Sequence, residues 1–243
     1  MNQRVPVAIV TGASRGLGRA LAGGLRGRGW ALVIDGRDPS ALREAELELR
    51  GAGPSEAPLL AVPGDVRDAQ HRRALAESAG GLGGLDLLVN NAGVLGPSPL
   101  PPLADYPLDG LREVVEVNLV APLALFQATA GMLRAAPGGG RVVMVTSDAA
   151  VEAYPGWGGY GAAKGAVEQL AAVLAAEEPD LHVWWMDPGD LRTRMHQEAF
   201  PGEDISDRPL PETVVPPFLR LIESGRPSGR VRLADLGTEE SGG

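Results

Sequence analysis

Tyr160 and Lys164 stand at a spacing that places both side chains on one face of a helix. A tyrosine phenol has a pKa of about 10, and a cation one helical turn away would lower it. Ser147 directly follows an apolar run and offers a hydroxyl that can donate a hydrogen bond to a reacting oxygen. These three residues are suited to delivering a proton to a carbonyl oxygen while the carbonyl is reduced.

A glycine-rich turn lies between an apolar run and a helical pattern near the start of the chain. Residues 11–18 read Thr-Gly-Ala-Ser-Arg-Gly-Leu-Gly. Gly12 permits a tight turn, and Gly16 and Gly18 allow a ligand to approach the backbone closely. The first N–H groups of the helix and its dipole favour a pyrophosphate there, so the turn predicts a dinucleotide site. A plain loop in a chain with 34 glycines is the alternative.

Short apolar runs alternate with helical patterns along the chain, as expected for a parallel sheet with crossover helices. The expected strands are Val5–Val10, Ala31–Asp35, Leu59–Pro63, Leu85–Asn90, Arg141–Thr146, Leu181–Asp187 and Arg230–Leu233. The expected helices are Gly16–Arg28, Pro39–Arg50, Ala69–Ala79, Asp109–Leu133, Gly158–Glu177 and Glu212–Glu223. Most strand runs are continuously apolar, which indicates burial on both faces. The sequence therefore predicts an α/β fold with a doubly wound parallel sheet and helices on both faces.

No linker or fixed-period repeat divides the chain, and its Pro- and Gly-rich stretches are typical of surface loops. We expect one domain over residues 1–237, with a substrate loop at about 194–212 and a flexible tail at 238–243. Asp38 precedes Pro39 and is expected to cap the helix that begins there.

The composition excludes several classes of function. The 22 basic residues are 21 arginines and one lysine, Lys164, against 31 Asp and Glu, so the net charge is −9. An acidic surface repels phosphate backbones and anionic lipids, which argues against nucleic-acid and membrane partners. The chain has no cysteine and only three scattered histidines, so we expect no disulfide and no metal site. No apolar run approaches the roughly 20 residues of a membrane helix, and no signal peptide is evident, so a cytoplasmic protein is expected.

The chain resembles the classical branch of the short-chain dehydrogenase/reductase (SDR) family. The matching motifs are Thr11–Gly18, Asp65-Val66, Asn90-Asn91-Ala92-Gly93, Asn118, Ser147 with Tyr160-x-x-x-Lys164, and Pro188-Gly189 with Thr193. Each motif is short, but their order is specific. The resemblance implies a single Rossmann-like domain, a nicotinamide coenzyme and interconversion of carbonyls and alcohols. It weakens after Ser228, where the family's further helix and strand and its late Asp-Gly-Gly have no counterpart.

The resemblance implies a catalytic set of four residues. Asn118 is its fourth member, and in the family this residue supports a water linked to the lysine. Lys164 would also hold the nicotinamide ribose through its N–H donors. The expected catalytic residues are Asn118, Ser147, Tyr160 and Lys164.

The resemblance also implies contacts to the coenzyme along its whole length. Asp65 is expected to accept a hydrogen bond from the adenine amino group, while Val66 contributes its backbone. The backbone N–H of Leu191 and the hydroxyl of Thr193 are expected to bind the carboxamide. The expected coenzyme residues are Gly12, Ser14, Arg15, Gly16, Leu17, Gly18, Arg37, Asp65, Val66, Asn91, Ala92, Gly93, Tyr160, Lys164, Pro188, Gly189, Leu191 and Thr193.

The end of the second strand distinguishes NADP from NAD. An acidic residue there would bind the ribose diol of NAD, whereas a basic residue would meet the 2′-phosphate of NADP. The position that is acidic in NAD-selective members is Gly36, and Arg37 follows it. Arg15 in the glycine turn adds a second guanidinium, so NADP(H) is favoured over NAD. Asp35 argues the other way, because it would repel a phosphate or, with a shifted register, bind a ribose.

The substrate is expected at the carboxyl ends of the strands. The expected walls are Leu95, residues 148–157 and the loop after Thr193, which contains Met195, His196, Phe200 and Ile205. Tyr154 and Trp157 form either an apolar wall or part of a subunit interface. His196 is either a further acid or base or a solvated bystander.

These observations favour an NADP(H)-dependent oxidoreductase that interconverts a ketone or aldehyde and an alcohol, with Tyr160 as general acid and base. A non-catalytic sensor of NADP on the same fold and an epimerase or dehydratase are the alternatives. The expected partners are a small carbonyl or alcohol substrate and further copies of the chain. A homodimer through Asp109–Leu133 and Gly158–Glu177, or a homotetramer, is expected by analogy.

Overall fold

Seven strands form one parallel sheet in the order β3-β2-β1-β4-β5-β6-β7 in a computed structural model that describes residues 4–52 and 56–236. The strands are β1 (Val7–Val10), β2 (Ala31–Gly36), β3 (Leu59–Pro63), β4 (Leu87–Asn90), β5 (Arg141–Val145), β6 (His182–Asp187) and β7 (Gly229–Arg232). All paired strands run parallel, so the predicted fold class is confirmed. The tail predicted at 238–243 lies outside the described residues.

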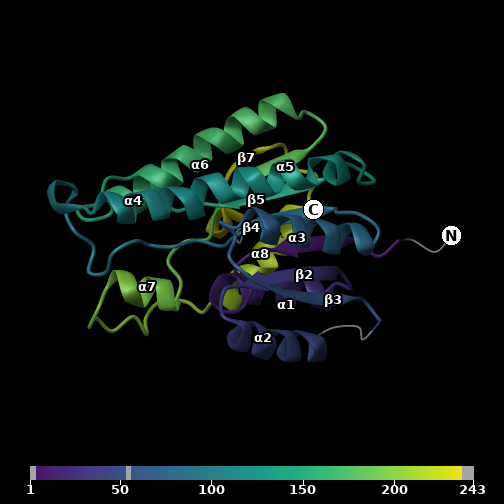
Figure 1. The fold of residues 1–243 in the computed structure, drawn as a ribbon, viewed down its shortest axis with the longest axis horizontal. Helices are drawn as coiled ribbons and strands as arrows, with labels where there is room; N and C mark the ends of the chain where they lie inside the picture. Colours follow the sequence, from purple (N-terminus) through teal and green to yellow (C-terminus); the bar gives the residue numbers. More distant parts are fainter. Residues whose placement is uncertain (1–3, 53–55, 237–243) are drawn as a thin grey trace, which may run out of the picture.

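Helices cover both faces of the sheet (Figure 1). One face carries α1 (Gly16–Gly27), α2 (Pro39–Gly51) and α8 (Val215–Glu223). The other carries α3 (Ala69–Gly81), α5 (Ala121–Arg134) and α6 (Gly158–Glu177). A short helix α4 (Leu108–Val115) leads into α5, and α7 (Arg194–Ala199) lies beyond the sheet.

Side chains of β1 show how the strands fill both layers. Ala8 and Val10 join the core under α1 and α8, while Val7 and Ile9 join the core under α3 and α5. All four are fully buried, because successive side chains of a strand point to opposite faces. This explains why the central strands are continuously apolar rather than alternating with polar residues.

The structure differs from the expected helices at three places. The helix expected at Glu212–Glu223 begins as a 3-10 turn, η4 (Pro211–Val214), and is α-helical only over Val215–Glu223. The helix expected at Asp109–Leu133 is interrupted by a π-helical turn, η2 (Glu116–Val120). The loop expected after Thr193 contains α7, because the Thr193 hydroxyl accepts a hydrogen bond from His196 N and caps that helix. The cap expected at Asp38 is confirmed, since its carboxylate accepts from the N–H groups of Ser40 and Ala41.

The helical stretch Leu108–Arg134, made of α4, η2 and α5, is long and apolar enough to cross a membrane by length and composition, and it contains an 18-residue window with a mean hydropathy of 1.4. Half of that window is buried inside the domain, and its α5 part packs against α3 and the central strands. Packing in the core therefore accounts for the apolar residues of the buried half.

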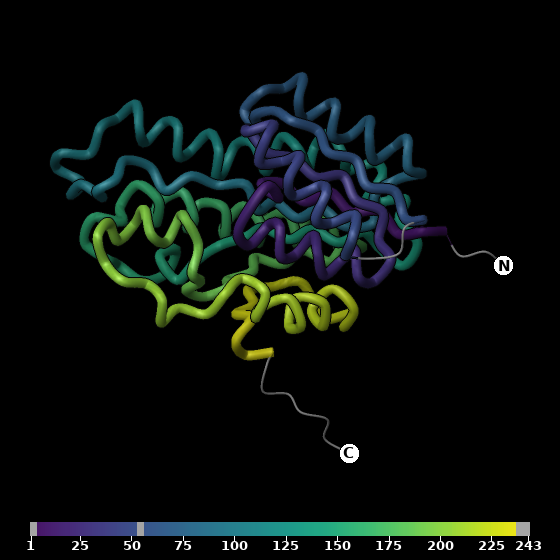
Figure 2. The backbone as a smooth tube through the Cα atoms, turned by 90° about the horizontal axis from the view of Figure 1, so that it is seen from below, coloured from purple at the N-terminus to yellow at the C-terminus, as the bar shows by residue number. Residues whose placement is uncertain are grey.

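The carboxyl ends of β1 and β4 lie side by side at the point where the strand order reverses. Open α/β sheets bind ligands at this point, because the connections that follow the two strands leave in opposite directions. In both Figure 1 and Figure 2, residues 95–107 and 194–210 extend beyond the same end of the sheet. The fold thus brings the two loops to the edge where the predicted motifs end.

Candidate active site

A pocket of about 660 Å³ follows the carboxyl edge of the sheet, from the glycine turn to Tyr160. Its size is typical of cofactor and substrate sites. The lining residues come from the ends of β1, β2, β4, β5 and β6, from α6 and from the segment that leads into α7. Residues that are distant in the sequence therefore share one cavity.

The glycine turn is packed so tightly that side chains are excluded at two positions. Gly12 has φ +65°, and a Cβ there would lie 2.9 Å from Cα of Ala92. A Cβ at Gly18 would lie 2.5 Å from the carbonyl oxygen of Gly12. Helix α1 begins at Gly16, and Arg15 at its N-cap makes no side-chain capping bond. The first residues of α1 line the pocket, and the free N–H groups of a helix N-terminus suit an anion.

The segment after β4 supports this turn. Asn91 Nδ2 donates to the carbonyl oxygen of Thr11 at 2.7 Å and to that of Gly12 at 3.3 Å. In return, the Thr11 hydroxyl accepts from the backbone N–H groups of Asn91 and Ala92. Asn91 and Ala92 also line the pocket, so the residues that support the glycine turn face the cavity as well.

The Asp35 side chain contacts the glycine turn and a histidine of α3. Its side chain is buried, Oδ1 accepts the N–H of Gly12 at 2.6 Å, and Oδ2 lies 2.9 Å from Nε2 of His71. The histidine ring packs so closely on Gly64 that a Cβ there would lie 2.2 Å from Nδ1. The carboxylate therefore fixes the glycine turn through Gly12 and does not reach for a ribose.

We expect Asp35→Ala to lower the free energy of unfolding by about 2–4 kcal/mol, because it leaves the buried Gly12 N–H and the buried His71 ring without their hydrogen-bond partner. Urea unfolding measures the loss as a lower midpoint at constant slope. Asp35→Asn keeps an acceptor for Gly12 and is the matched control, with a smaller loss. A loss below about 0.5 kcal/mol for Asp35→Ala contradicts this role.

The other end of the pocket is built on α6, which places Tyr160 and Lys164 on one face. Lys164 is 4% exposed, and its Nζ donates to the carbonyl oxygen of Val145 at 2.7 Å. The same nitrogen lies 5.5 Å from the centre of the Tyr160 ring. Burial lowers the pKa of Lys164 to about 8, since the charged ammonium loses solvation.

The pKa of Tyr160 differs from the sequence expectation. Burial, followed by the negative charges of Asp148 and Asp187, raises its pKa, and a hydrogen bond with Ser147 opposes the rise only in part. The expected net lowering by Lys164 is wrong for this structure, because burial and the two carboxylates outweigh the effect of the neighbouring ammonium on the pKa. The buried phenol is held protonated at neutral pH, which suits a proton donor.

Ser147 stands at the end of β5 and lines the pocket beside Tyr160. Its hydroxyl donates to Oδ1 of Asp148 at 2.8 Å and accepts the N–H of Ala149 at 3.2 Å. Asp148 also accepts from the hydroxyl of Tyr154 at 3.0 Å. Ser147 is therefore held in place by Asp148, which was expected only as part of the substrate wall.

Asn118 lies in the π-helical turn η2 and is buried. Its Nδ2 donates to the carbonyl oxygen of Val94, and its Oδ1 accepts the N–H of the same residue, both at 2.9 Å. The side chain thereby joins the long helix to the segment after β4. Asn118 is absent from the pocket lining among residues 4–52 and 56–236, unlike the other three predicted catalytic residues.

Comparison with known proteins decides the family. The family model described as short chain dehydrogenase matches residues 6–204. The chain belongs to the short-chain dehydrogenase family.

Sepiapterin reductase of Mus musculus is 36% identical over 202 residues, which cover 79% of this chain and 77% of that protein. A protein of Sesamum indicum named 11-beta-hydroxysteroid dehydrogenase A is 30% identical over 226 residues, or 90% of this chain. The chain spans only 63% of the length of that sesame protein. A solved short-chain dehydrogenase of Shigella flexneri, complexed with NADP, is 27% identical with a TM-score of 0.87, covering 96% of this chain and 100% of that one.

All eighteen predicted coenzyme residues line the pocket of this short-chain dehydrogenase. Several of them, besides Gly12, Asn91 and Lys164, are already engaged in other bonds. Asp65 is bound by the guanidinium of Arg67, which lowers the pKa of its carboxyl. The carbonyl oxygen of Val66 accepts from Arg72 at 2.6 Å, and the Thr193 hydroxyl caps α7. These contacts show that the predicted residues also hold the local structure.

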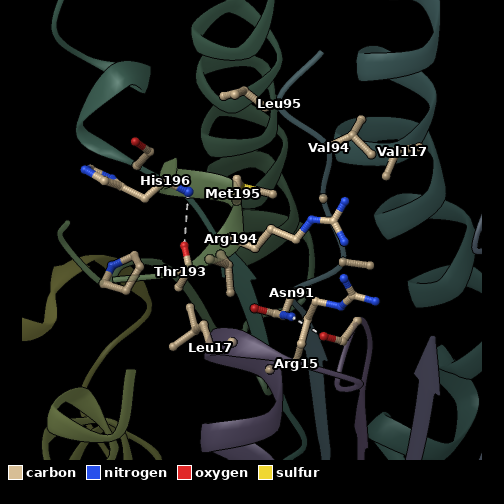
Figure 3. Close-up of a pocket in the computed structure, with 18 of the residues that line it drawn as sticks. Arg15, Leu17, Asn91, Val94, Leu95, Val117, Thr193, Arg194, Met195 and His196 are labelled. Carbon is tan, nitrogen blue, oxygen red and sulfur yellow. Dashed lines mark hydrogen bonds between the residues drawn. The ribbon is translucent and has the colours of Figure 1, made fainter. Parts of the chain in front are cut away.

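The substrate end of the short-chain dehydrogenase pocket is lined by Leu95, Trp157, Met195 and His196, which Figure 3 shows in part. Trp157 packs edge-on against Tyr160, with ring centres 5.8 Å apart. His196 stacks on Phe200, and its buried Nε2 has no hydrogen-bond partner in the described part of the chain. The expected wall is present only in part, because Tyr154, Phe200 and Ile205 do not line the pocket in the described part of the chain. His196 is a packed residue rather than a solvated one.

Sequence reasoning missed several residues at this site. Asp187 lines the pocket. Arg194 was predicted only as the start of the substrate loop, but it also lines the pocket, and in the view of Figure 3 it extends in the same direction as Arg15. His71 and Arg230 lie behind the lining and bind its carboxylates. Asp187 could have been predicted from its position directly before the Pro188-Gly189 motif, whereas His71 and Arg230 belong to no motif.

Proposed function

We propose that this short-chain dehydrogenase is an NADP(H)-dependent oxidoreductase that interconverts a ketone or aldehyde and an alcohol. One observation carries the proposal: a single pocket has an anion-binding glycine turn at one end and the buried Tyr160–Lys164 pair at the other. This arrangement fits an elongated dinucleotide whose reactive ring lies next to a proton donor.

The residues present fit a nicotinamide dinucleotide. The turn at Gly12 and Gly18 has no room for side chains, and the N-terminus of α1 offers backbone donors to a pyrophosphate. Arg37 is exposed at the end of β2 and lines the pocket together with Arg15, which suits a 2′-phosphate. The burial of Asp35 removes the main objection to NADP, and the Shigella flexneri relative is complexed with NADP.

The proposed mechanism divides the work between three side chains. The bound coenzyme supplies or accepts the hydride. Tyr160, protonated at neutral pH, donates its proton to the carbonyl oxygen and takes it back in the reverse direction. Lys164 stabilises the phenolate that Tyr160 leaves behind. Ser147 donates its single hydroxyl proton to the same oxygen, which requires that it release Asp148.

A panel of neutral ketones and aldehydes, assayed by oxidation of NADPH and of NADH, tests the proposal. We expect net NADPH oxidation with at least one carbonyl and a lower kcat/KM with NADH. Binding of NADPH without turnover of any carbonyl would indicate a sensor. Conversion of a substrate without net NADPH consumption would indicate an epimerase or dehydratase.

Arg37 provides a direct test of coenzyme preference. We expect Arg37→Ser to weaken NADPH binding about tenfold, because a charge-assisted bond to the 2′-phosphate is lost, and to leave NADH binding within about twofold. Fluorescence titration of both coenzymes measures the two dissociation constants. Arg43→Ser is the matched control, since Arg43 pairs with Glu46 on α2. Equal weakening of NADPH and NADH binding would argue against the NADP assignment.

We also propose that the protein assembles as a homodimer or homotetramer. Leu108, Val120 and Val173 are exposed on α4, η2 and α6, on the face expected to meet a second copy. Exposed apolar side chains on one side of a domain favour burial in an interface. Light scattering coupled to gel filtration measures the mass, and a monomer at micromolar concentration would contradict the proposal.

A further inference from the structure

Arg230 on β7 joins three segments of the site from behind. Its Nε donates to Oε1 of Glu168 at 3.0 Å, and its Nη2 donates to the carbonyl oxygen of Ser147 and to Oδ2 of Asp187, each at 3.2 Å. These acceptors belong to α6, to the end of β5 and to the end of β6. Arg230 lies beyond the part of the chain that matches the family model, which ends at residue 204.

The two carboxylates that Arg230 binds are largely removed from water. The side chains of Asp187 and Glu168 are 4% and 12% exposed. Glu168 also accepts from the Thr146 hydroxyl, and Asp187 accepts the N–H of Gly189. Buried carboxylates need a cation, and the planar guanidinium satisfies both while it still reaches a carbonyl oxygen.

Each acceptor belongs to, or stands next to, a residue of the mechanism or of the pocket lining. Glu168 follows Lys164 by one turn of α6. Ser147 presents its hydroxyl to the pocket while its carbonyl oxygen faces Arg230. Asp187 directly precedes the Pro188-Gly189 wall. A shift of Arg230 would therefore disturb the hydroxyl of Ser147 and the helix that carries the tyrosine and lysine.

We propose that Arg230 is a positioning residue of the active site, which fixes Ser147 and offsets the charge of Asp187 beside Tyr160. This inference rests on the proposed function. It predicts an effect on the chemical step and on its pH dependence, with little effect on the binding of coenzyme.

The charges that face Tyr160 come from all the elements packed around it. The carboxylates are Asp148 on η3 (Asp148–Ala150), Asp187 at the end of β6 and Glu168 on α6. The cations are Lys164 on α6 and, on β7, Arg230 and the more exposed Arg232. The phenol of Tyr106 packs against Gly159. Asp148 and Asp187 both raise the pKa of Tyr160. Loss of Arg230 would leave Asp187 less compensated, so the pKa of Tyr160 would rise further.

The test uses three variants: Arg230→Gln, Arg230→Lys, and the double variant Arg230→Gln with Asp187→Asn. Alcohol oxidation needs the tyrosine deprotonated, so its rate rises with pH through the apparent pKa of the catalytic group. We expect Arg230→Gln to lower kcat about tenfold to a hundredfold, with the NADPH dissociation constant within about threefold. The pH midpoint of kcat should move up by about half to one unit.

The other two variants separate positioning from simple structural support. Arg230→Lys keeps the positive charge but loses the planar guanidinium that binds several acceptors at once. The pH midpoint of kcat should therefore stay near the wild-type value while kcat itself falls. The double variant removes the charges of both Arg230 and Asp187, so it should return the pH midpoint of kcat toward the wild-type value. If Arg230→Gln does not fold, the double variant provides the test. If folded Arg230→Gln keeps both the wild-type kcat and the wild-type pH midpoint, the inference is overturned. It is also overturned if the double variant has the same pH midpoint as Arg230→Gln. A wild type that turns over no carbonyl overturns the proposed function, whereas an active wild type with an insensitive variant overturns only the role of Arg230.

Discussion

Tyr160→Phe is expected to lower kcat for carbonyl reduction by a factor of about 10²–10⁴, while NADPH binding stays within about threefold. The substitution removes only the phenolic oxygen, so the packing of the ring against Trp157 and the shape of the pocket are kept. The proton donor is lost, and Ser147 cannot replace it because a serine hydroxyl is a much weaker acid. Steady-state kinetics with a reactive aldehyde and fluorescence titration of NADPH measure the two quantities.

Tyr106→Phe is the matched control for this prediction. The hydroxyl of Tyr106 is buried without a hydrogen-bond partner in the described chain, and burial raises its pKa. Removal of that hydroxyl should leave kcat within about twofold, since an unsatisfied polar group is lost from the core. Wild-type kcat in Tyr160→Phe would refute the proposed mechanism, and a comparable loss in Tyr106→Phe would point to packing around α6 as the cause.

Lys164→Met is expected to abolish most of the activity and yet stabilise the free protein. Methionine matches the length of the lysine stem but has no charge, so the phenolate of Tyr160 is no longer stabilised, and kcat should fall about a hundredfold or more. The lysine is buried with a pKa lowered to about 8, so keeping it charged at pH 7 costs folding free energy. After the lost bond to Val145 is subtracted, the gain should be about 2 kcal/mol.

The gain in stability should depend on pH in one direction. Below pH 8 both folded and unfolded states carry the proton, so the wild type bears the full cost of the buried charge. Between pH 8 and 10.5 the folded state releases the proton first, and wild-type stability rises toward that of Lys164→Met. Urea unfolding of both proteins at pH 7 and 9.5 measures the difference. A constant difference at the two pH values would show that the lysine is not held at a lowered pKa.

The site motifs were predictable because their chemistry is local. Tyr160 and Lys164 share one helical face whatever surrounds them, and the turn from Gly12 to Gly18 needs glycine because of its own backbone and its contact with β4. The strands were predictable for a similar reason, since burial on both faces demands continuous apolar runs. Expected and observed strand ends differ by at most two residues, for example at Val7 and Leu87.

Long-range contacts were not predictable, because the partners are far apart in the sequence and follow no motif. From the sequence, Asp35 was expected either to bind a ribose or to repel a 2′-phosphate, because nothing in the sequence places His71 of α3 next to it. The expected effect of Lys164 on the pKa of Tyr160 was wrong, because helical spacing gives nearness but not the burial or the carboxylates that outweigh it.

The sequence by itself determined the fold class and most of the residues that line the pocket, because spacing and backbone geometry carry that information. Only the tertiary structure decided which charges those residues experience. The electrostatics of Tyr160 depend on Asp187 and Arg230, which meet because β6 and β7 pair at the edge of the sheet. Strand pairing brings together residues that no local pattern relates, so the charge balance of the site appears only when the chain is folded.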